Sequence, residues 1–256
     1  MQPHIEVNGE LPTTAALRAL TLSGYGHFTA IQVRDRRVRG LDLHLARLDQ
    51  ANRELFGVAL DGGQVRDYIR HALSASTTAD ASVRVIVEQP AADEPPWVMV
   101  TIRPPAAPPA GPITMQSAPY QRSVAHIKHS KDFGQGYYDR LARRNGYDQA
   151  LLTGPDGLIS EGAITNIGFF DGTTVVWPAA PMLLGTTMQV VQERLGYPQR
   201  HQAVRLADLG AFSTVFVTNS HGVAAVSRVD GRELPVDAEF IKLVTESYES
   251  APADQI

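Results

Sequence analysis

Hydrophobic positions in the first hundred residues follow a period of two in some stretches and a helical period in others. The helical stripe is clearest over residues 42–57, where Leu45, Leu48 and Leu55 repeat, Asp42 is the expected cap and Gly57 ends the run. A second helix is predicted over residues 64–75. Strands are predicted on both sides of a turn at 35–37 and in two runs rich in β-branched residues, 82–88 and 97–103.

The pattern changes after a segment rich in proline and alanine. Residues 104–112, PPAAPPAGP, cannot pair as a central strand and predict a linker between domains. Beyond it, a helix is predicted over 137–145, another begins at Gly185 and Thr186, and a third covers 236–248. The predicted strands between them are short and closely spaced: 149–153, 157–160, 166–170, 174–178, 213–219 and 223–229. Such a mixture predicts an α+β domain with a barrel-like sheet.

Composition narrows the class of protein. The chain has 256 residues with 43% hydrophobic and 20% charged, which is ordinary for a soluble globular protein. Without cysteine it has neither disulfides nor thiolate chemistry, and its histidines are too loosely spaced to predict a metal site. The net charge of −4 argues against nucleic acid as the main partner, and no apolar run is long enough for a bilayer. The N-terminus does not have the pattern of a secretory signal, so we expect a cytoplasmic protein.

Lysine is scarce among the basic residues. There are twenty arginines and three lysines, Lys128, Lys131 and Lys242. Genomic base composition accounts for such a bias, yet an arginine cannot replace a neutral lysine amine in carbonyl chemistry. Lys128 and Lys131 therefore stand out as candidates for that chemistry.

Residues 126–172 bring together groups that a pyridoxal-phosphate (PLP) enzyme needs. Such an enzyme requires a lysine for the imine, a carboxylate for the pyridine nitrogen, and a cationic or N–H-rich cradle for the phosphate. Lys128 precedes a predicted helix, and Glu161 follows a predicted short strand in the segment 161–166, EGAITN. By itself, Lys128 would be a surface lysine and Glu161 a turn residue.

This segment resembles the core of the class IV aminotransferases, which are fold type IV PLP enzymes. The family has a lysine, then a helix, then a strand that ends in E-G-x-x-x-N. The resemblance implies that Lys128 carries PLP as a Schiff base and that Glu161 pairs with the pyridine nitrogen. It also places Thr165 and Asn166 among the cofactor-binding residues, and it makes Lys131 a solvated flank.

Further blocks in the family's order support the resemblance. Residues 44–48, HLARL, are similar to its H-x-x-R-L motif, in which the arginine, here Arg47, contacts the phosphate. Thr186 and Thr187 open a helix where the family binds phosphate, and a helix N-terminus is a natural anion site. Asn219 and Ser220 occupy the position of a small hydroxyl residue that completes the phosphate cup, although asparagine departs from the pattern.

The resemblance implies a fold and an assembly. We expect a small N-terminal α/β domain over 1–110 and a larger C-terminal pseudo-barrel α/β domain over 113–256 that binds the cofactor. The family works as a homodimer, so a homodimer is expected here.

Substrate choice is not fixed by these motifs. Tyr25, Phe28, Thr29 and Arg84 are the candidate substrate-binding residues. Core packing for the aromatics, strand propensity for Thr29 and a solvent-facing Arg84 remain open alternatives. The strand with Arg84 and Glu88 matches neither the branched-chain nor the D-amino acid enzymes.

Three functions follow from these motifs. The first is an aminotransferase that exchanges an amino group between an amino acid or amine and a keto acid. The second is an aminodeoxychorismate lyase-like enzyme that releases pyruvate, with Thr29 as a proton relay. The third is a cofactor-free binding protein.

Overall fold

The computed structural model describes residues 3–91 and 93–256, and it divides into two compact units. The first unit comprises residues 1–106, 127–131 and 252–256, and the second comprises 107–126 and 132–251. Two short segments predicted within the larger C-terminal domain therefore lie with the first unit. Backbone hydrogen bonds explain this, because Phe28 N donates to Lys128 O and Ile256 N donates to Arg36 O, both at 2.9 Å.

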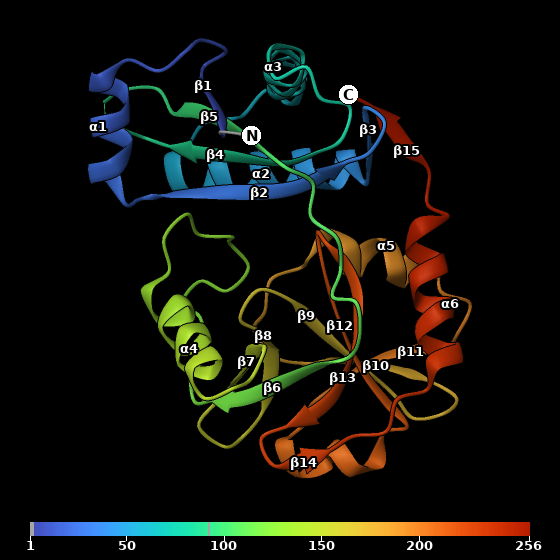
Figure 1. The fold of residues 1–256 in the computed structure, drawn as a ribbon. Coiled ribbons are helices and arrows are strands. Elements are labelled where there is room, and N and C mark those ends of the chain that lie inside the picture. The colour runs from blue at the N-terminus through green and yellow to red at the C-terminus, as the bar shows by residue number, and fades with distance from the viewer. Residues whose placement is uncertain (1–2, 92) are drawn as a thin grey trace. The chain divides into compact units, whose positions relative to one another are not determined.

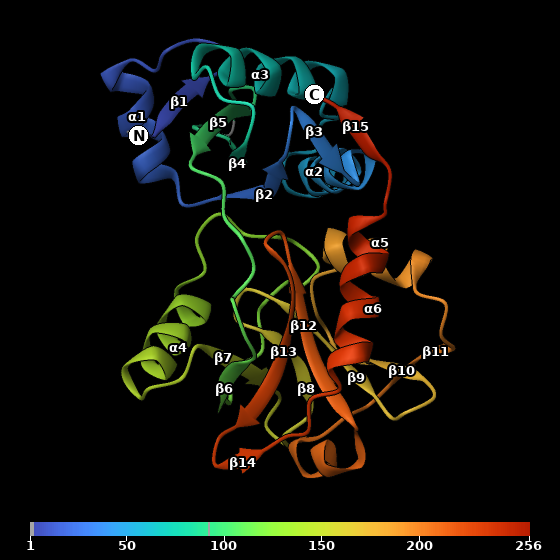
Figure 2. The ribbon, with the colours of Figure 1, turned by 45° about the vertical axis from the view of Figure 1, so that its right-hand side comes forward.

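The first unit is built on a four-stranded antiparallel sheet in the order β1-β5-β4-β2 (Figure 1). A separate two-stranded ribbon joins β3 to β15, the strand nearest the C-terminus (Figure 2). The strands and helices of this unit are β1 His4–Val7, α1 Thr14–Ser23, β2 Gly26–Val33, β3 Arg37–Arg39, α2 Leu41–Phe56, α3 Gly62–Ala75, β4 Ala81–Glu88, β5 Trp97–Arg103 and β15 Ala253–Gln255.

One face of this sheet carries the core of the first unit. Alternate strand residues such as Ile31, Val85 and Val100 pack against Leu48 of α2 and Ile69 of α3. Since strand residues alternate between faces, the neighbouring positions point to the opposite face. The sheet therefore separates a helix-covered apolar face from a second face with more polar residues.

The helices begin and end where local chemistry allows. The stripe predicted over 42–57 is α2, but its N-cap is Gly40 at φ 63° rather than Asp42, which lies in the first turn. The second helix starts at Gly62 because the Asp61 side chain accepts from the N–H groups of Gly63 and Gln64. The helix predicted to begin at 137 begins at Phe133, because the Asp132 carboxylate caps it.

The second unit contains a larger mixed sheet. Its strand order is β11-β10-β9-β12-β13-β6-β7-β8, with β14 paired to β13. Its elements are β6 Ile113–Ala118, α4 Phe133–Arg144, β7 Gln149–Thr153, β8 Ile159–Gly162, β9 Asn166–Phe170, β10 Val175–Pro178, α5 Thr186–Arg194, β11 Gln199–Gln202, the 3-10 helix Leu206–Ala211, β12 Thr214–Asn219, β13 Gly222–Val229, β14 Arg232–Glu233 and α6 Ala238–Glu249.

This sheet curls into a partial barrel. The strand at one end of the order, β8, contacts β9 and β10 from the other part of the sheet. Side chains from β9, β12 and β13 fill the interior, and α5 and α6 cover a second apolar cluster that contains Trp177 and Phe240. The α+β architecture with a barrel-like sheet is as predicted.

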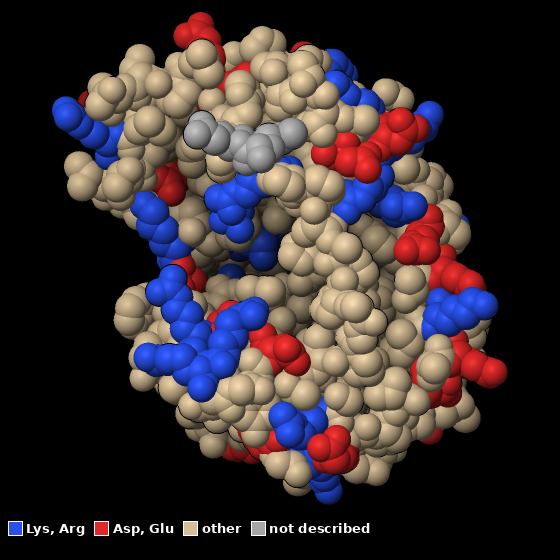
Figure 3. All heavy atoms as spheres, viewed as in Figure 1, with Lys and Arg blue, Asp and Glu red and all other residues tan. Residues whose placement is uncertain are grey.

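Charge is distributed without a dominant sign on the face in Figure 3. Basic and acidic side chains alternate there, and basic residues gather over α4, whose exposed arginines are Arg140, Arg143 and Arg144. Among the described residues, no helix combines the length and the apolar character needed to cross a bilayer. In the same part of the chain, no group of three or more potential ligands is arranged to hold a metal ion.

Candidate active site

Lys128 lies in a short extended segment along the edge of β2. Its carbonyl accepts a hydrogen bond from Phe28 N, and Ser130 N donates to Gly26 O, each at 2.9 Å. The Lys128 ammonium is 4.8 Å from the centroid of the Phe28 ring. The Arg84 guanidinium lies over the same ring at 4.6 Å. Phe28 is therefore a neighbour of the predicted reactive lysine, and Arg84 contacts the same ring.

Lys131, the competing lysine, is occupied by structural contacts. Its amine donates to the carbonyls of Leu20 and Thr21, at 3.1 and 3.2 Å, at the C-terminal end of α1. It also lies 3.9 Å from the Glu88 carboxylate. A cation at a helix C-terminus is stabilised by the exposed carbonyls. Lys131 is thus solvent-exposed, as a flanking residue is expected to be, and it is also held by these contacts.

Arg47 of α2 is half-buried, with its Nε buried, and contacts Thr29 of β2. Its Nη2 donates to the Thr29 hydroxyl at 2.5 Å, and this hydroxyl lies 2.7 Å from His44 Nδ1. Since Arg47 can only donate, the hydroxyl hydrogen is left to donate to His44 Nδ1. Burial, followed by the charges of Arg47 and Lys128, holds the pKa of His44 well below its ordinary value, so the imidazole is neutral.

The Arg47 guanidinium has no acidic partner among the described residues. Its Nε is buried without a hydrogen-bond partner, and burial lowers the pKa of Arg47 to about 10. A buried cation without a counter-charge is costly, and a bound anion removes that cost. The arrangement therefore fits the phosphate role that the sequence predicts for Arg47.

Glu161 is buried in β8 of the second unit and is held on both oxygens. Arg122 Nη1 donates to Oε1 at 3.1 Å, and the Leu183 N–H donates to Oε2 at 3.2 Å. Arg122 also lies 3.6 Å from the Asp132 carboxylate, which in turn accepts from the Tyr120 hydroxyl at 2.9 Å. Arg122 favours the ionised carboxylate, as a partner for a protonated ring nitrogen must be.

The rest of the segment 161–166 supports Glu161 through close packing. Thr165 Oγ1 donates to Gln149 Oε1 at 2.6 Å, and Asn166 Nδ2 donates to Leu183 O at 2.6 Å. A Cβ at Gly162 would lie 2.2 Å from both Gln149 Oε1 and Thr165 Oγ1. The structure thus gives Thr165 and Asn166 contacts that position neighbouring residues; direct cofactor binding by them stays a prediction.

The N-terminus of α5 provides a second group of anion donors. Gly185 is its N-cap without a side-chain hydrogen bond, and the buried Thr186 hydroxyl has no partner among the described residues. Thr187 Oγ1 donates to the Asn219 carbonyl at 2.7 Å. The Asn219 side chain accepts from His221 N, and Ser220 is half-buried in the same turn. The free N–H groups and the Thr186 hydroxyl fit a phosphate group.

Tyr25 is the predicted residue that lies apart from these contacts. It is 56% exposed and packs edge-on against Phe56, with ring centroids 5.8 Å apart. Arg122 stands in no motif of the sequence, and His44 is predicted only as the first residue of the H-x-x-R-L motif. A buried arginine 39 residues before the carboxylate that it contacts has no recognisable spacing in the sequence.

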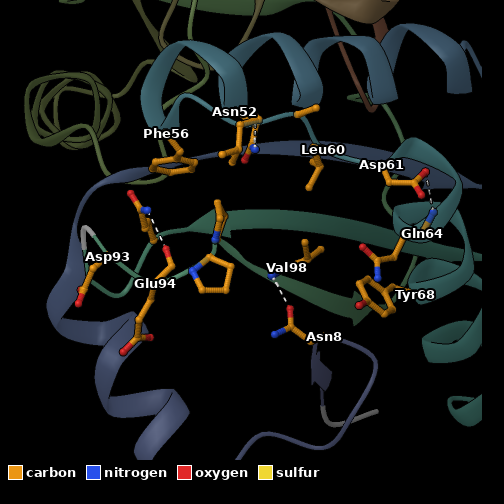
Figure 4. Close-up of a pocket in the computed structure, with 15 residues that line it drawn as sticks. Asn8, Asn52, Phe56, Leu60, Asp61, Gln64, Tyr68, Asp93, Glu94 and Val98 are labelled. Carbon is orange, nitrogen blue, oxygen red and sulfur yellow. Dashed lines mark hydrogen bonds between the residues drawn. The ribbon is translucent and has the colours of Figure 1, made fainter.

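A cavity of about 710 Å³ on the first unit contains none of the predicted site residues. Figure 4 shows Phe56 and Asn52 on one side of it and Val98 and Asn8 on the other. The buried Asn52 donates to Val58 O at 2.8 Å, and the exposed Asn8 accepts from Val98 N at 2.9 Å. Among the described residues that line it, no buried side-chain donor or acceptor lacks a partner.

The fold and these residues define an α+β protein with a lysine, a held carboxylate and two sets of unpartnered anion donors. A family model described as amino-transferase class IV matches residues 26–229, and the chain belongs to this family. A probable branched-chain-amino-acid aminotransferase of Rickettsia typhi is 30% identical over 115 residues. This match spans 42% of the chain and 40% of the relative's length.

Solved structures with the same fold cover nearly the whole chain. A hypothetical aminotransferase from Mycobacterium tuberculosis, in a PLP-bound form, has a TM-score of 0.84 at 22% identity and covers 97% of this chain and 99% of its own. The branched-chain amino acid aminotransferase of Escherichia coli also has a TM-score of 0.84, at 19% identity, covering 96% and 93%. At these identities the likeness establishes the fold.

Proposed function

We propose that this protein is a PLP-dependent aminotransferase that exchanges an amino group between an amino acid or amine and a keto acid. The observation that carries the proposal is the pair of unpartnered anion donors, Arg47 Nε and Thr186 Oγ1, at the two places where the family binds phosphate. Family membership, Lys128 and Glu161 support the same assignment.

The bound cofactor supplies the electron-accepting ring that makes the substrate's α-proton removable. Arg47 would bind the phosphate, and the neutral His44 with Thr29 orients Arg47. The start of α5 offers further donors that suit an anion. Glu161, fixed by Arg122 and the Leu183 N–H, would hold a proton on the ring nitrogen. Lys128 would hold the cofactor through Nζ and would move the proton at the substrate α-carbon.

Substrate binding is assigned to the residues around Phe28. Arg84 shares the Phe28 ring with Lys128, and it is partly exposed with no acidic partner among the described residues. A substrate carboxylate meets this guanidinium, which presents a planar pair of donors. The burial of Arg84 and the nearby charge of Arg103 both lower its pKa, so an anion beside it is favourable.

The lyase alternative assigns proton transfer to Thr29. Its hydroxyl accepts from Arg47 and lies 2.7 Å from His44 Nδ1, so its one hydrogen is already donated to that imidazole. This favours an aminotransferase over pyruvate release, and product analysis separates the two. The homodimer implied by the family and the cytoplasmic location expected from the sequence belong to the proposal as well. Light scattering tests it, and a fully active monomer would contradict it.

The test of the proposal is where PLP attaches. Borohydride reduction of PLP-loaded protein should leave a pyridoxyl group on Lys128, found by peptide mapping. The Lys128→Ala variant should lose the adduct. The Lys131→Ala variant should keep it, because the Lys131 amine donates to a carbonyl of α1. An adduct on Lys131, or no visible or near-ultraviolet cofactor band in any form, would overturn the assignment.

A further inference from the structure

The second face of the four-stranded sheet is arranged in rows around the lysine. Residues opposite one another on antiparallel strands project from the same face. Phe28 is opposite Ile86 and Ile86 opposite Met99, which makes one row. Ala30, Arg84 and Thr101 form the row on one side of it, and Gly26, Glu88 and Trp97 form the row on the other.

The segment with Lys128 extends these rows by one position. His129 bridges His27 in antiparallel fashion, so Lys128 stands opposite Phe28 and Ser130 opposite Gly26. The ammonium over the Phe28 ring confirms this placement. Lys128 therefore belongs to the Phe28 row, and Ser130 to the Glu88 row. Rows on a strand lie about 7 Å apart, so the Arg84 row and the Glu88 row flank the Lys128 row at about that spacing on either side.

Glu88 has an unsatisfied carboxylate oxygen in this position. The residue is 3% exposed, and its Oε2 is buried with no hydrogen-bond partner among the described residues. The buried hydroxyl of Ser130, in the same row, also has none. A Cβ at Gly26 would lie 2.4 Å from Glu88 Cγ, so the glutamate lies across β2 where only glycine leaves room.

A structural role explains only one of the two oxygens of the Glu88 carboxylate. Lys131 Nζ lies 3.9 Å from Oε1, so Glu88 helps to hold the segment that carries Lys128. The other oxygen gains nothing from that contact, and leaving a buried carboxylate oxygen unpaired is unfavourable. A ligand with a hydrogen-bond donor satisfies both Oε2 and the Ser130 hydroxyl.

We propose that Glu88 is a specificity-determining residue, which selects substrates whose side chain carries a hydroxyl or ammonium donor. The inference rests on the proposed aminotransferase function and names the substrate class of that site. Arg84 takes the carboxylate on one side of the Lys128 row, and Glu88 accepts from the distal donor on the other. An aliphatic side chain of the same size leaves Oε2 unpaired and is therefore disfavoured.

The test compares two achiral keto acids of equal size, 4-hydroxy-2-oxobutanoate and 2-oxopentanoate, with the amine-loaded enzyme in single turnovers. Wild type should prefer the hydroxy acid in kcat/KM by about tenfold or more. Glu88→Leu should abolish or reverse that preference, and Glu88→Gln, which retains an acceptor, should keep part of it. Lys131→Met is the matched control, because it removes the ion pair and leaves Glu88 in place.

Equilibrium binding of inert analogues gives a second readout. Titration of the holoenzyme with 4-hydroxybutanoate and pentanoate should show the same order of Kd values and the same response to the variants. A wild type that favours the aliphatic compounds, or a Glu88→Leu protein with an unchanged ratio, would overturn the proposal. A ratio that changes equally in Lys131→Met would reduce Glu88 to a structural role. Failure to bind PLP or to react with any keto acid would instead remove the proposed function.

Discussion

Glu161 is fixed by two donors, so a change of its charge can be separated from a change of its position. Glu161→Gln keeps the size of the side chain and an oxygen for Arg122 or the Leu183 N–H. It removes the negative charge that holds a proton on the ring nitrogen. We expect the chemical step to slow by about 100-fold or more, or about 2.7 kcal/mol of barrier, with PLP still bound.

The half-reaction with excess PLP measures this effect on folded protein. A purely structural role predicts a lower melting temperature and an unchanged saturated rate. A Glu161→Gln protein that reacts at the wild-type rate would therefore remove the residue from the mechanism.

Arg47→Ala should give the opposite pattern. The variant removes a guanidinium whose buried Nε has no hydrogen-bond partner in the described part of the chain, so cofactor affinity should fall by about 10- to 100-fold. The rate with saturating PLP should change less. Arg53→Ala on the same helix is the control, because Arg53 is mostly exposed and pairs with Asp49 at 2.9 Å. Equal losses of affinity in both variants would contradict the assignment.

His27 predicts how stability depends on pH. It is buried beside Asn52 and Phe56, and burial lowers its pKa from 6.5 to about 4. As the pH falls below about 6.5, the unfolded chain binds a proton that the folded chain refuses, so stability falls until about pH 4. The loss from this residue is about 3 kcal/mol.

Urea unfolding at pH 7 and at pH 4 measures the effect. His27→Gln should show a smaller loss of unfolding free energy on acidification than wild type, because the amide does not titrate. An identical loss of unfolding free energy in the two proteins would mean that protonation of His27 does not destabilise the folded state.

Individual residues were predictable only where a motif fixed their neighbours. Lys128, Arg47 and Glu161 stand in short patterns that are visible along the chain, and the structure gives each of them an environment that suits its predicted role. Arg122 could not be found in this way, because its contact with Glu161 depends on the path of the chain between β6 and β8. Spatial neighbours that are far apart in sequence leave no local pattern.

Helices and strands followed the hydrophobic pattern, and their ends followed capping chemistry. The predicted strand at 149–153 is β7 with the same bounds, since five consecutive buried residues leave little choice. The predicted start of α4 was wrong by four residues. The exposed Phe133 does not belong to the hydrophobic period, and the Asp132 cap sets the first residue of the helix. Strands such as β1 and β15 are too short for periodicity, and only pairing with β5 and β3 makes them strands.

Gly185 tests the element that carries the second set of anion donors. A Cβ there would lie 2.0 Å from Asn166 Oδ1, whose amide nitrogen also holds Leu183 O. Gly185→Ala should therefore displace the start of α5 or Asn166, and weaken PLP binding by about tenfold, a change of about 1.4 kcal/mol. Fluorescence titration with PLP measures the affinity.

Gly196→Ala provides the comparison at the other end of α5. No atom of the described residues lies within 4 Å of a Cβ at Gly196, so this variant should bind PLP as wild type does. If Gly185→Ala also binds PLP normally, the close approach of Asn166 and Gly185 has no part in the cofactor site.

At the scale of the whole molecule, each compact unit is assembled from separate stretches of chain. The sequence predicted a linker at 104–112, and the structure has no helix or strand there, with the first division between the units after Ala106. It did not predict that residues 127–131 and 252–256 belong to the first unit. A hydrophobic pattern predicts which residues are buried, but it does not predict which other part of the chain they pack against. Here the backbone pairing of these two segments with β2 and β3 places them in the first unit.

The last residues of the chain therefore contribute to the stability of the first unit. Ile256 is 4% exposed and belongs to the core cluster that contains Leu48, Ile69 and Val85. Its N–H donates to Arg36 O at 2.9 Å, next to the ribbon of β15 and β3. Ile256→Ala leaves that backbone contact possible and removes only buried apolar volume, so unfolding free energy should fall by about 2–4 kcal/mol.

Gln255→Ala separates this effect from a general sensitivity of the C-terminal strand. Gln255 is exposed, and its backbone carbonyl, which accepts from Arg66, is unchanged by the substitution. The control should unfold within about 0.5 kcal/mol of wild type. Denaturation followed by amide hydrogen exchange should place the loss in Ile256→Ala among the amides of β2, β4 and β5, whose side chains share its core. Protection lost instead in the barrel-like sheet of the second unit, or an Ile256→Ala protein as stable as the control, would show that the C-terminal segment does not complete this core.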